Sequence, residues 1–120
     1  MINYLSGDEV VAINQEVIQI SEDPHGLMNE ANLSHLVEGM RLKYNGHEDE
    51  LILKAAFILD YIANKGHIFI EGNKRTAETT TITFLRLNSL FFEEKDQKEM
   101  ACFVLSVAQG KESLTSIAKW

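Results

Sequence analysis

The chain has 120 residues, of which 45% are hydrophobic and 24% charged, and we expect residues 1–120 to form a single domain with one core. Its formal net charge of −7 disfavours direct binding of nucleic acid over the whole surface, because contacts with phosphates need a basic face. The single cysteine, Cys102, excludes an internal disulfide and lies in an apolar run that is typical of a buried thiol.

A capping pattern marks the first predicted helix. Ser6 and Glu9 match the S-x-x-E pattern, in which the two side chains satisfy free N–H groups at a helix start. We expect this helix to stop before Pro24, with His25 and Gly26 in the turn after it. Its buried side is predicted from apolar residues at helical spacing, namely Val10, Ile13, Val17 and Ile20.

Two further helices are predicted from their apolar patterns. Residues 32–43 carry a buried stripe, and Gly39 inside it, which costs about 1 kcal/mol relative to alanine, indicates a close packing contact. Residues 45–49 are predicted to form a loop. Residues 50–64 are apolar on most sides, which places this helix at the centre of the domain. Gly66 suits the position just after its end.

A fourth helix is predicted from 73 to 88, directly after the segment that holds most of the polar chemistry. A short extended piece at 90–92, a fifth helix at 97–109 and a last helix at 113–119 complete the chain. The predicted fold class is therefore all-α, a bundle of five to six helices. The polar segment forms a loop between the two central helices.

That segment is HIFIEGNKRT, which begins at His67. A histidine can accept a proton near neutral pH, and the carboxylate of Glu71 can hold a hard divalent cation. Gly72 lets the backbone come close to an anion, and the helix start at Asn73 offers free N–H groups to it. Phe69 is expected to anchor the loop in the core, on the face opposite Ile68 and Ile70, and so to fix the polar groups in place.

Two cations lie in the first turn of the fourth helix. Lys74 and Arg75 are placed where the helix dipole disfavours positive charge, so we expect a compensating anion there, such as a phosphate. Simpler interpretations of the neighbouring residues stay open. His67 can be structural, Glu71 can merely complement the dipole, and Asn73 can be a helix N-cap.

The same segment resembles the signature of the Fic/Doc family, H-P-F-x-D/E-G/A-N-G/K-R. The spacing is unbroken, and Ile68 departs from the usual proline. The all-α pattern also agrees with the family fold over most of the chain. The positions that match the signature are His67, Phe69, Glu71, Gly72, Asn73, Lys74 and Arg75.

Departures at two positions favour one branch of that family. AMP-transferring Fic enzymes have a small residue after the asparagine and a second arginine three positions beyond the first, where this chain has Lys74 and Glu78. The run GNKRTA and the chain length are similar to the Doc (death-on-curing) branch, the toxins of toxin–antitoxin modules. The resemblance implies a kinase that moves the γ-phosphoryl group of ATP to a Ser or Thr hydroxyl of a protein. Its implied substrate class is translation elongation factor.

The resemblance also implies roles for individual residues. His67 would accept the proton of the target hydroxyl, and Glu71 would hold Mg²⁺ against the phosphates. Lys74 and Arg75 would stabilise the charge that grows in the transition state. The residues implied to bind the nucleotide are Gly72, Asn73, Lys74 and Arg75.

The implied partner is a cognate antitoxin, which would itself bind DNA, so that this chain touches DNA only indirectly. The amino-terminal sequence has no basic start and no apolar stretch of signal-peptide length, and no run approaches the roughly 20 apolar residues of a membrane helix. We therefore expect the protein in the cytoplasm and away from membranes. Zinc is not expected, because the four histidines lack ligand-like spacing.

Three alternatives stay open. The chain can be an AMP-transferring Fic protein, which Glu78 disfavours, or a module that binds a nucleotide or a partner without turnover. In addition, Ser34, Glu38 and Gly39 match a loose pattern that marks an inhibitory helix in Fic enzymes. A solvent-facing role for Glu38 in an amphipathic helix is the simpler interpretation.

Overall fold

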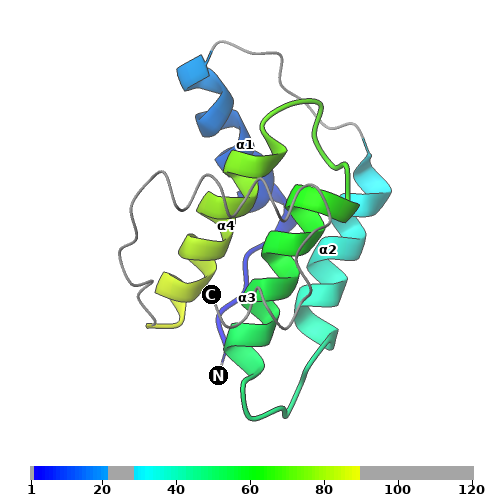
Figure 1. Ribbon diagram of the computed structural model, residues 1–120, viewed down its shortest axis with the longest axis vertical. Helices are drawn as coiled ribbons and strands as arrows, with labels where there is room; N and C mark the ends of the chain where they lie inside the picture. Colours follow the sequence, from blue (N-terminus) through cyan, green and yellow to red (C-terminus); the bar gives the residue numbers. More distant parts are fainter. Residues whose placement is uncertain (1, 22–28, 90–120) are drawn as a thin grey trace.

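The computed structural model describes residues 2–21 and 29–89. These ranges form the α-helices α1 (Gly7–Ser21), α2 (Glu30–Leu42), α3 (Glu50–Asp60) and α4 (Asn73–Leu87), and a π-helical turn, η1 (Tyr61–Lys65), continues α3 (Figure 1). No strand occurs within them, and the all-α prediction is confirmed. The elements expected at 90–92, 97–109 and 113–119 lie outside the described residues.

Helix α3 occupies the centre of the bundle (Figure 1). It packs against α4 and α2, while α1 packs against α4. All residues from Lys54 to Asp60 are buried, which confirms the central position predicted for this helix. No helix in the described part of the chain has both the length and the apolar character needed to cross a membrane. The apolar core includes Leu5, Val10, Leu36, Met40, Ile58, Ile62, Ile68, Phe69 and Phe84.

The predicted capping box at the start of α1 is confirmed. The Ser6 N–H donates to Glu9 Oε1 at 3.0 Å, and the Glu9 N–H donates to Ser6 Oγ at 3.2 Å. The buried side differs from the predicted one in part. Among the α1 side chains that the structure describes, Val10, Asn14 and Ile18 are fully buried, while Ile13 and Val17 are only partly buried; the side chain of Ile20 lies outside that description. The predicted stripe therefore missed a polar residue at its middle. The helix ends at Ser21, and the predicted turn at 24–26 lies outside the described residues.

Helix α2 begins two residues before the predicted start at Asn32. The reason is a cap: the side-chain oxygen of Asn29 accepts a hydrogen bond from the Asn32 N–H at 3.0 Å. The close contact predicted at Gly39 is confirmed, because a Cβ added there would lie 2.5 Å from Cζ of Phe57. Gly39 thus lets α2 and α3 approach each other.

The loop predicted at 45–49 is confirmed as part of a connection between α2 and α3 that runs from 43 to 49, and a buried cation holds this connection. Lys54 is fully buried, and its Nζ donates to Met40 O at 2.7 Å, to Lys43 O at 2.8 Å and to Asn45 Oδ1 at 2.8 Å. Each ammonium hydrogen therefore has an acceptor, and two of these acceptors are carbonyls at the end of α2. A positive charge is favourable there because it opposes the helix dipole.

The single helix predicted for 50–64 is wrong in its last turn. The α-helical register stops at Asp60, and η1 takes over because the Gly66 N–H donates to Tyr61 O, five residues back, at 2.7 Å. Gly66 itself is right-handed (φ −79°), and the left-handed residue expected after a helix is His67 (φ 44°). Gly66 is required for space instead, since a Cβ there would lie 2.8 Å from Cε1 of Tyr61.

Candidate active site

Residues 66–72, hereafter the motif loop, connect η1 to α4 and are held by hydrogen bonds to their backbone carbonyls. Asn32 Nδ2 on α2 donates to Gly66 O at 2.6 Å. The Asn29 N–H donates to Ile68 O at 3.1 Å. Asn14 Nδ2 on α1 donates to Glu71 O at 3.0 Å. Two helices that precede the loop by many residues therefore fix its path.

The side chain of Asn73 closes the loop onto its own helix. Its Nδ2 donates to Phe69 O at 2.9 Å, and its Oδ1 accepts from the Phe69 N–H at 3.2 Å. The interpretation of Asn73 as the N-cap is wrong, because the cap is Gly72 and the first bond of α4 runs from the Thr76 N–H to Gly72 O at 2.8 Å. Asn73 is the first helical residue, and its side chain orders the loop.

The apolar residues of the loop act as its anchor. Phe69 is 1% exposed, as predicted. The expected alternation is wrong for Ile68, which is also fully buried, and only Ile70 is exposed. The reason is that the loop is not an extended strand: it turns at the left-handed His67 and is bonded back to Asn73, so side chains do not alternate.

The residues proposed for chemistry lie in the motif loop and in the first turn of α4. The side chains of His67, Glu71, Lys74 and Arg75 are all exposed to solvent. His67 has φ 44°, a left-handed conformation that costs a non-glycine residue about 1–2 kcal/mol and needs support from its surroundings. The bonds to Gly66 O and Ile68 O, on either side of His67, supply such support. The four residues lie within nine positions of one another in the sequence, in the motif loop and the first turn of α4.

The start of α4 is positively charged in two ways. Its first turn contains two cations and no acid. The N–H groups of Asn73 and Lys74 precede the first intrahelical bond and so add the positive end of the helix dipole. Gly72 has φ 80° and packs against α1, where a Cβ would lie 2.7 Å from Cδ1 of Ile18. These features favour a bound anion.

Asn14 is a site residue that the sequence reasoning missed. It is 1% exposed, and its Nδ2 donates both to Glu71 O and, at 3.0 Å, to Thr76 Oγ1 on α4. One available signal is its spacing, since it lies four residues from both Val10 and Ile18 on the buried side of α1. An asparagine in an apolar stripe indicates a specific polar contact in the core.

Glu78 lies one turn beyond Lys74 on α4 and is half-buried. Desolvation by its surroundings raises the pKa of this carboxyl above its ordinary value. A carboxylate here opposes binding of an anion, whereas the arginine of AMP-transferring enzymes would favour it.

A divalent cation would find one carboxylate in the motif. Among the described residues no group of three or more His, Cys, Asp or Glu side chains could hold a metal ion. Mg²⁺ is commonly bound by one or two carboxylates together with substrate phosphates and water. The exposed Glu71, beside a helix start that favours phosphate, fits this donor set.

Glu38, the residue of the inhibitory pattern, lies on a different surface. It lines a pocket of about 490 Å³ between α2 and the α3–η1 segment, together with His35, Asp60, Tyr61 and Lys65. None of the residues that line this pocket belongs to the motif. The pocket therefore gives no support to a contact between Glu38 and the motif cations.

Comparison with known proteins agrees with the resemblance carried by the motif. Residues 4–85 match the model of the Fic/DOC family, a range that includes α1 to α3, the motif loop and most of α4. The chain is a member of the Fic/DOC family. It is also similar to the protein kinase doc of Escherichia phage P1, with 26% identity over 117 residues that cover 96% of this chain and 90% of the relative.

The matched range also includes the elements that hold the motif loop. The family match begins before α1 and so includes the helix that supplies Asn14 to the motif loop. It also includes Asn29 and Asn32, which hold the other end of the loop. The resemblance therefore extends from the motif to the elements that shape it.

Proposed function

We propose that this Fic/DOC protein is a Doc-like toxin of a toxin–antitoxin module. Its reaction is the transfer of the γ-phosphoryl group of ATP to a Ser or Thr hydroxyl of a protein of the translation machinery, of the elongation-factor class. The observation that carries the proposal is the first turn of α4, which follows the motif loop directly. This turn contains two exposed cations and no acidic residue. The similarity to a protein kinase doc supports the type of group transferred.

The nucleotide phosphates would bind at the start of α4. Gly72 and Asn73 would place backbone N–H groups against them, since helix starts bind phosphate through such groups and the dipole. Lys74 and Arg75 would neutralise the charge of the phosphates and of the transition state. Arginine supplies a planar fork and lysine a point charge, so the two are suited to different oxygens.

His67 would act as the general base. Its backbone is left-handed, and the carbonyls on either side of it accept hydrogen bonds, so the backbone from which the imidazole extends is held in place. The target hydroxyl would donate its proton to this ring as its oxygen attacks the γ-phosphorus, and ADP would leave. Proton transfer of this kind contributes roughly 10²–10⁴-fold to a rate.

Glu71 is the residue that would hold Mg²⁺. When bound, the cation supplies positive charge that offsets the charge of the phosphates. The hydrogen bond from Asn14 to the Glu71 carbonyl fixes the backbone of this residue. Its exposed carboxylate is then available beside the phosphate site.

The remaining features of the proposal concern the cell. A toxin requires a cognate antitoxin, which we propose as the main protein partner, with DNA contacted only through it. We further propose that the protein acts in the cytoplasm, where its substrate lies, and that no membrane is involved.

The deciding experiment traces label from ATP carrying ³²P at either the γ or the α position. Each is incubated with Mg²⁺, purified elongation factor and the protein. His67→Ala tests the base, and His35→Ala, another exposed histidine, is the matched control. Transfer of the γ label alone, lost in His67→Ala and kept in His35→Ala, supports the kinase.

Other outcomes separate the alternatives. Transfer of the α label would make the protein an AMP-transferase in spite of Glu78. Binding of nucleotide without transfer of either label, to elongation factor or to proteins of a cell lysate, would favour a non-catalytic module. In both cases the proposed kinase activity is wrong.

A further inference from the structure

The residue that precedes the proposed base is set by an unusual turn. In η1 the Gly66 N–H bonds to Tyr61 O, whereas an α-helix would use the carbonyl four residues back. Single π-turns of this kind occur inside helices and often lie at functional sites. Because each residue of an α-helix adds about 100° of rotation and 1.5 Å of rise, one extra residue changes both the direction and the position of the next segment. Only Gly66 separates the turn from His67.

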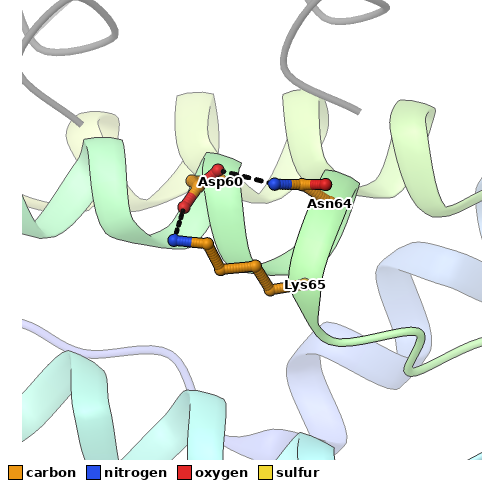
Figure 2. A network of polar contacts seen from close by, with 3 residues as sticks. All are labelled: Asp60, Asn64 and Lys65. Carbon is orange, nitrogen blue, oxygen red and sulfur yellow. Dashed lines mark hydrogen bonds and ion pairs between the residues drawn. The ribbon is translucent and has the colours of Figure 1, made fainter. Parts of the chain in front are cut away.

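An ion pair spans this turn. Lys65 Nζ lies 2.8 Å from Asp60 Oδ2, and Figure 2 shows the lysine side chain running back along η1 to the carboxylate. Asn64 Nδ2 lies 3.5 Å from the other oxygen, Oδ1. The two charged residues are five apart, which in an α-helix would leave them about 140° from alignment on the helix surface. The wider turn brings them to the same side.

The pair joins a buried group to an exposed one. The Asp60 side chain is 8% exposed and that of Lys65 is 65% exposed. A buried carboxylate needs a compensating charge or hydrogen bonds, so Asp60 draws Lys65 back over the turn. Since that contact depends on the five-residue spacing, Asp60 favours the π register over the α register.

The register of the turn affects the position of His67 because Gly66 joins the two. The Gly66 N–H is fixed by Tyr61 O, and Gly66 O is fixed by Asn32 Nδ2 at 2.6 Å. No side chain fits at Gly66, because a Cβ would lie 2.8 Å from Cε1 of Tyr61 and 3.0 Å from Cγ1 of Ile68. If the turn relaxed to the α register, this tightly enclosed residue would have to move and His67 would move with it.

We propose that Asp60 and Lys65 are positioning residues for His67, and that their ion pair holds the π-turn that sets the backbone of Gly66 and His67. This inference builds on the proposed function, in which His67 is the base. Both residues of the pair line the pocket that also contains Glu38, and no residue of the motif lines that pocket. They therefore act through the backbone and not by contact with the substrate.

The test uses Lys65→Met, which keeps the length of the side chain and removes its charge. Lys65 is exposed, so the variant is expected to fold. Lys65→Arg restores the charge, and Lys43→Met removes another exposed lysine of the same pocket as the matched control. Asp60→Asn alone and combined with Lys65→Met tests whether the two residues act as a pair.

The first readout does not depend on activity. In NMR spectra of the labelled protein, the His67 ring signals are assigned by their loss in His67→Ala, and His47, in the connection at the other end of α3, is the internal reference. We expect Lys65→Met to shift the His67 signals and to raise hydrogen exchange at the Gly66 amide about tenfold. Lys65→Arg and Lys43→Met should keep the wild-type values, and the double variant should change no more than the larger single one.

The second readout is phosphoryl transfer. Lys65→Met should lower kcat about tenfold while the KM for ATP stays unchanged, because the base is displaced and the phosphate site is not. Wild-type His67 signals and Gly66 exchange in Lys65→Met would overturn the inference, as would equal changes in Lys65→Arg. If the wild-type protein transfers no phosphoryl group, the proposed function fails, and the NMR readout still decides whether the pair positions His67.

Discussion

The connections before and after α3 are held by different means. Residues 43–49 are held by the buried Lys54, which reaches three acceptors from inside the fold, and at the surface by Glu50, whose Oε1 accepts from the Gly46 N–H. The motif loop depends on several asparagines, at 14, 32 and 73, that grip its backbone from neighbouring helices. The first connection is held mainly by the hydrogen bonds of one buried ammonium group, whereas the path of the motif loop is fixed by hydrogen bonds from several separate side chains. We therefore expect mutations at the first connection to affect mainly stability and those at the second to affect mainly the reaction.

The largest effect on stability is expected at Lys54. Lys54→Met keeps the apolar stem but leaves Met40 O and Lys43 O without their donor. Because buried acceptors without a partner are costly, the free energy of unfolding should fall by about 2–4 kcal/mol. Urea denaturation measures the loss, and the exposed Lys43→Met is the control. A loss below about 1 kcal/mol would show that this clamp contributes little.

Substitution of Asn14, which holds the motif loop, is expected to lower the rate of the reaction as well as the stability. Asn14→Leu removes the hydrogen bonds to Glu71 O and to the buried Thr76 Oγ1, at a cost of about 1–3 kcal/mol of stability. Since the loop loses its contact with α1, phosphoryl transfer per folded molecule should also fall about tenfold. Asn45→Ala, at the other connection, should cost stability without changing that rate. Equal rates in the two variants would contradict the distinction.

Two glycines provide a matched pair for the same question. Gly46 (φ 77°) and Gly72 (φ 80°) are both left-handed, but a Cβ at Gly46 meets open space, whereas one at Gly72 would lie 2.7 Å from Cδ1 of Ile18. Gly46→Ala should cost about 1 kcal/mol through backbone strain alone and leave transfer unchanged. Gly72→Ala should cost more and should weaken ATP binding, measured by calorimetry. Similar ATP affinities in both would show that Gly72 is not special to the site.

The smallest effect concerns pH. Desolvation raises the pKa of Glu78 above its ordinary value of 4.5, so the folded state binds this proton more tightly than the unfolded state. The free energy of unfolding is therefore highest, as far as Glu78 is concerned, below the ordinary pKa of this carboxyl. It decreases as the pH rises through the raised pKa of the folded state. Glu78→Gln should raise Tm slightly at pH 7, and the difference should shrink below pH 4.5. A constant difference at both pH values would exclude this explanation.

The features that could be predicted from the sequence depend on neighbours in the chain. Ser6 and Glu9 cap α1 as expected because both partners of the capping box lie within one turn. The burial of Phe69 could be predicted because a large apolar side chain stands out in a polar loop. The close contact at Gly39 could be predicted because a glycine stands out in an apolar stripe. The family signature likewise lies in one short segment.

The features that escaped prediction depend on partners far along the chain or on the shape of the backbone. Lys54 sits in an apolar helix, but its acceptors lie between 9 and 14 residues away. Asn14 meets Glu71 across 57 residues. The π-turn replaces an α-helical turn of the same residues, and the left-handed His67 follows it after Gly66. The local sequence therefore predicts neither the partners of Lys54 and Asn14 nor the choice between a π-turn and an α-helical turn.

The hydrogen bonds that shape the motif loop also determine when the site can exist during folding. They join the loop to residues 34 and 57 positions earlier, so they form only after α1 and α2 have docked onto α3 and α4. Contacts of such long sequence separation are slow to form because a large loop of chain must close first. A nascent or partly unfolded chain would thus carry the complete motif without the arrangement that makes it reactive. For a protein proposed to act on the translation machinery, we therefore expect activity only after α1 to α4 have been synthesised and packed together.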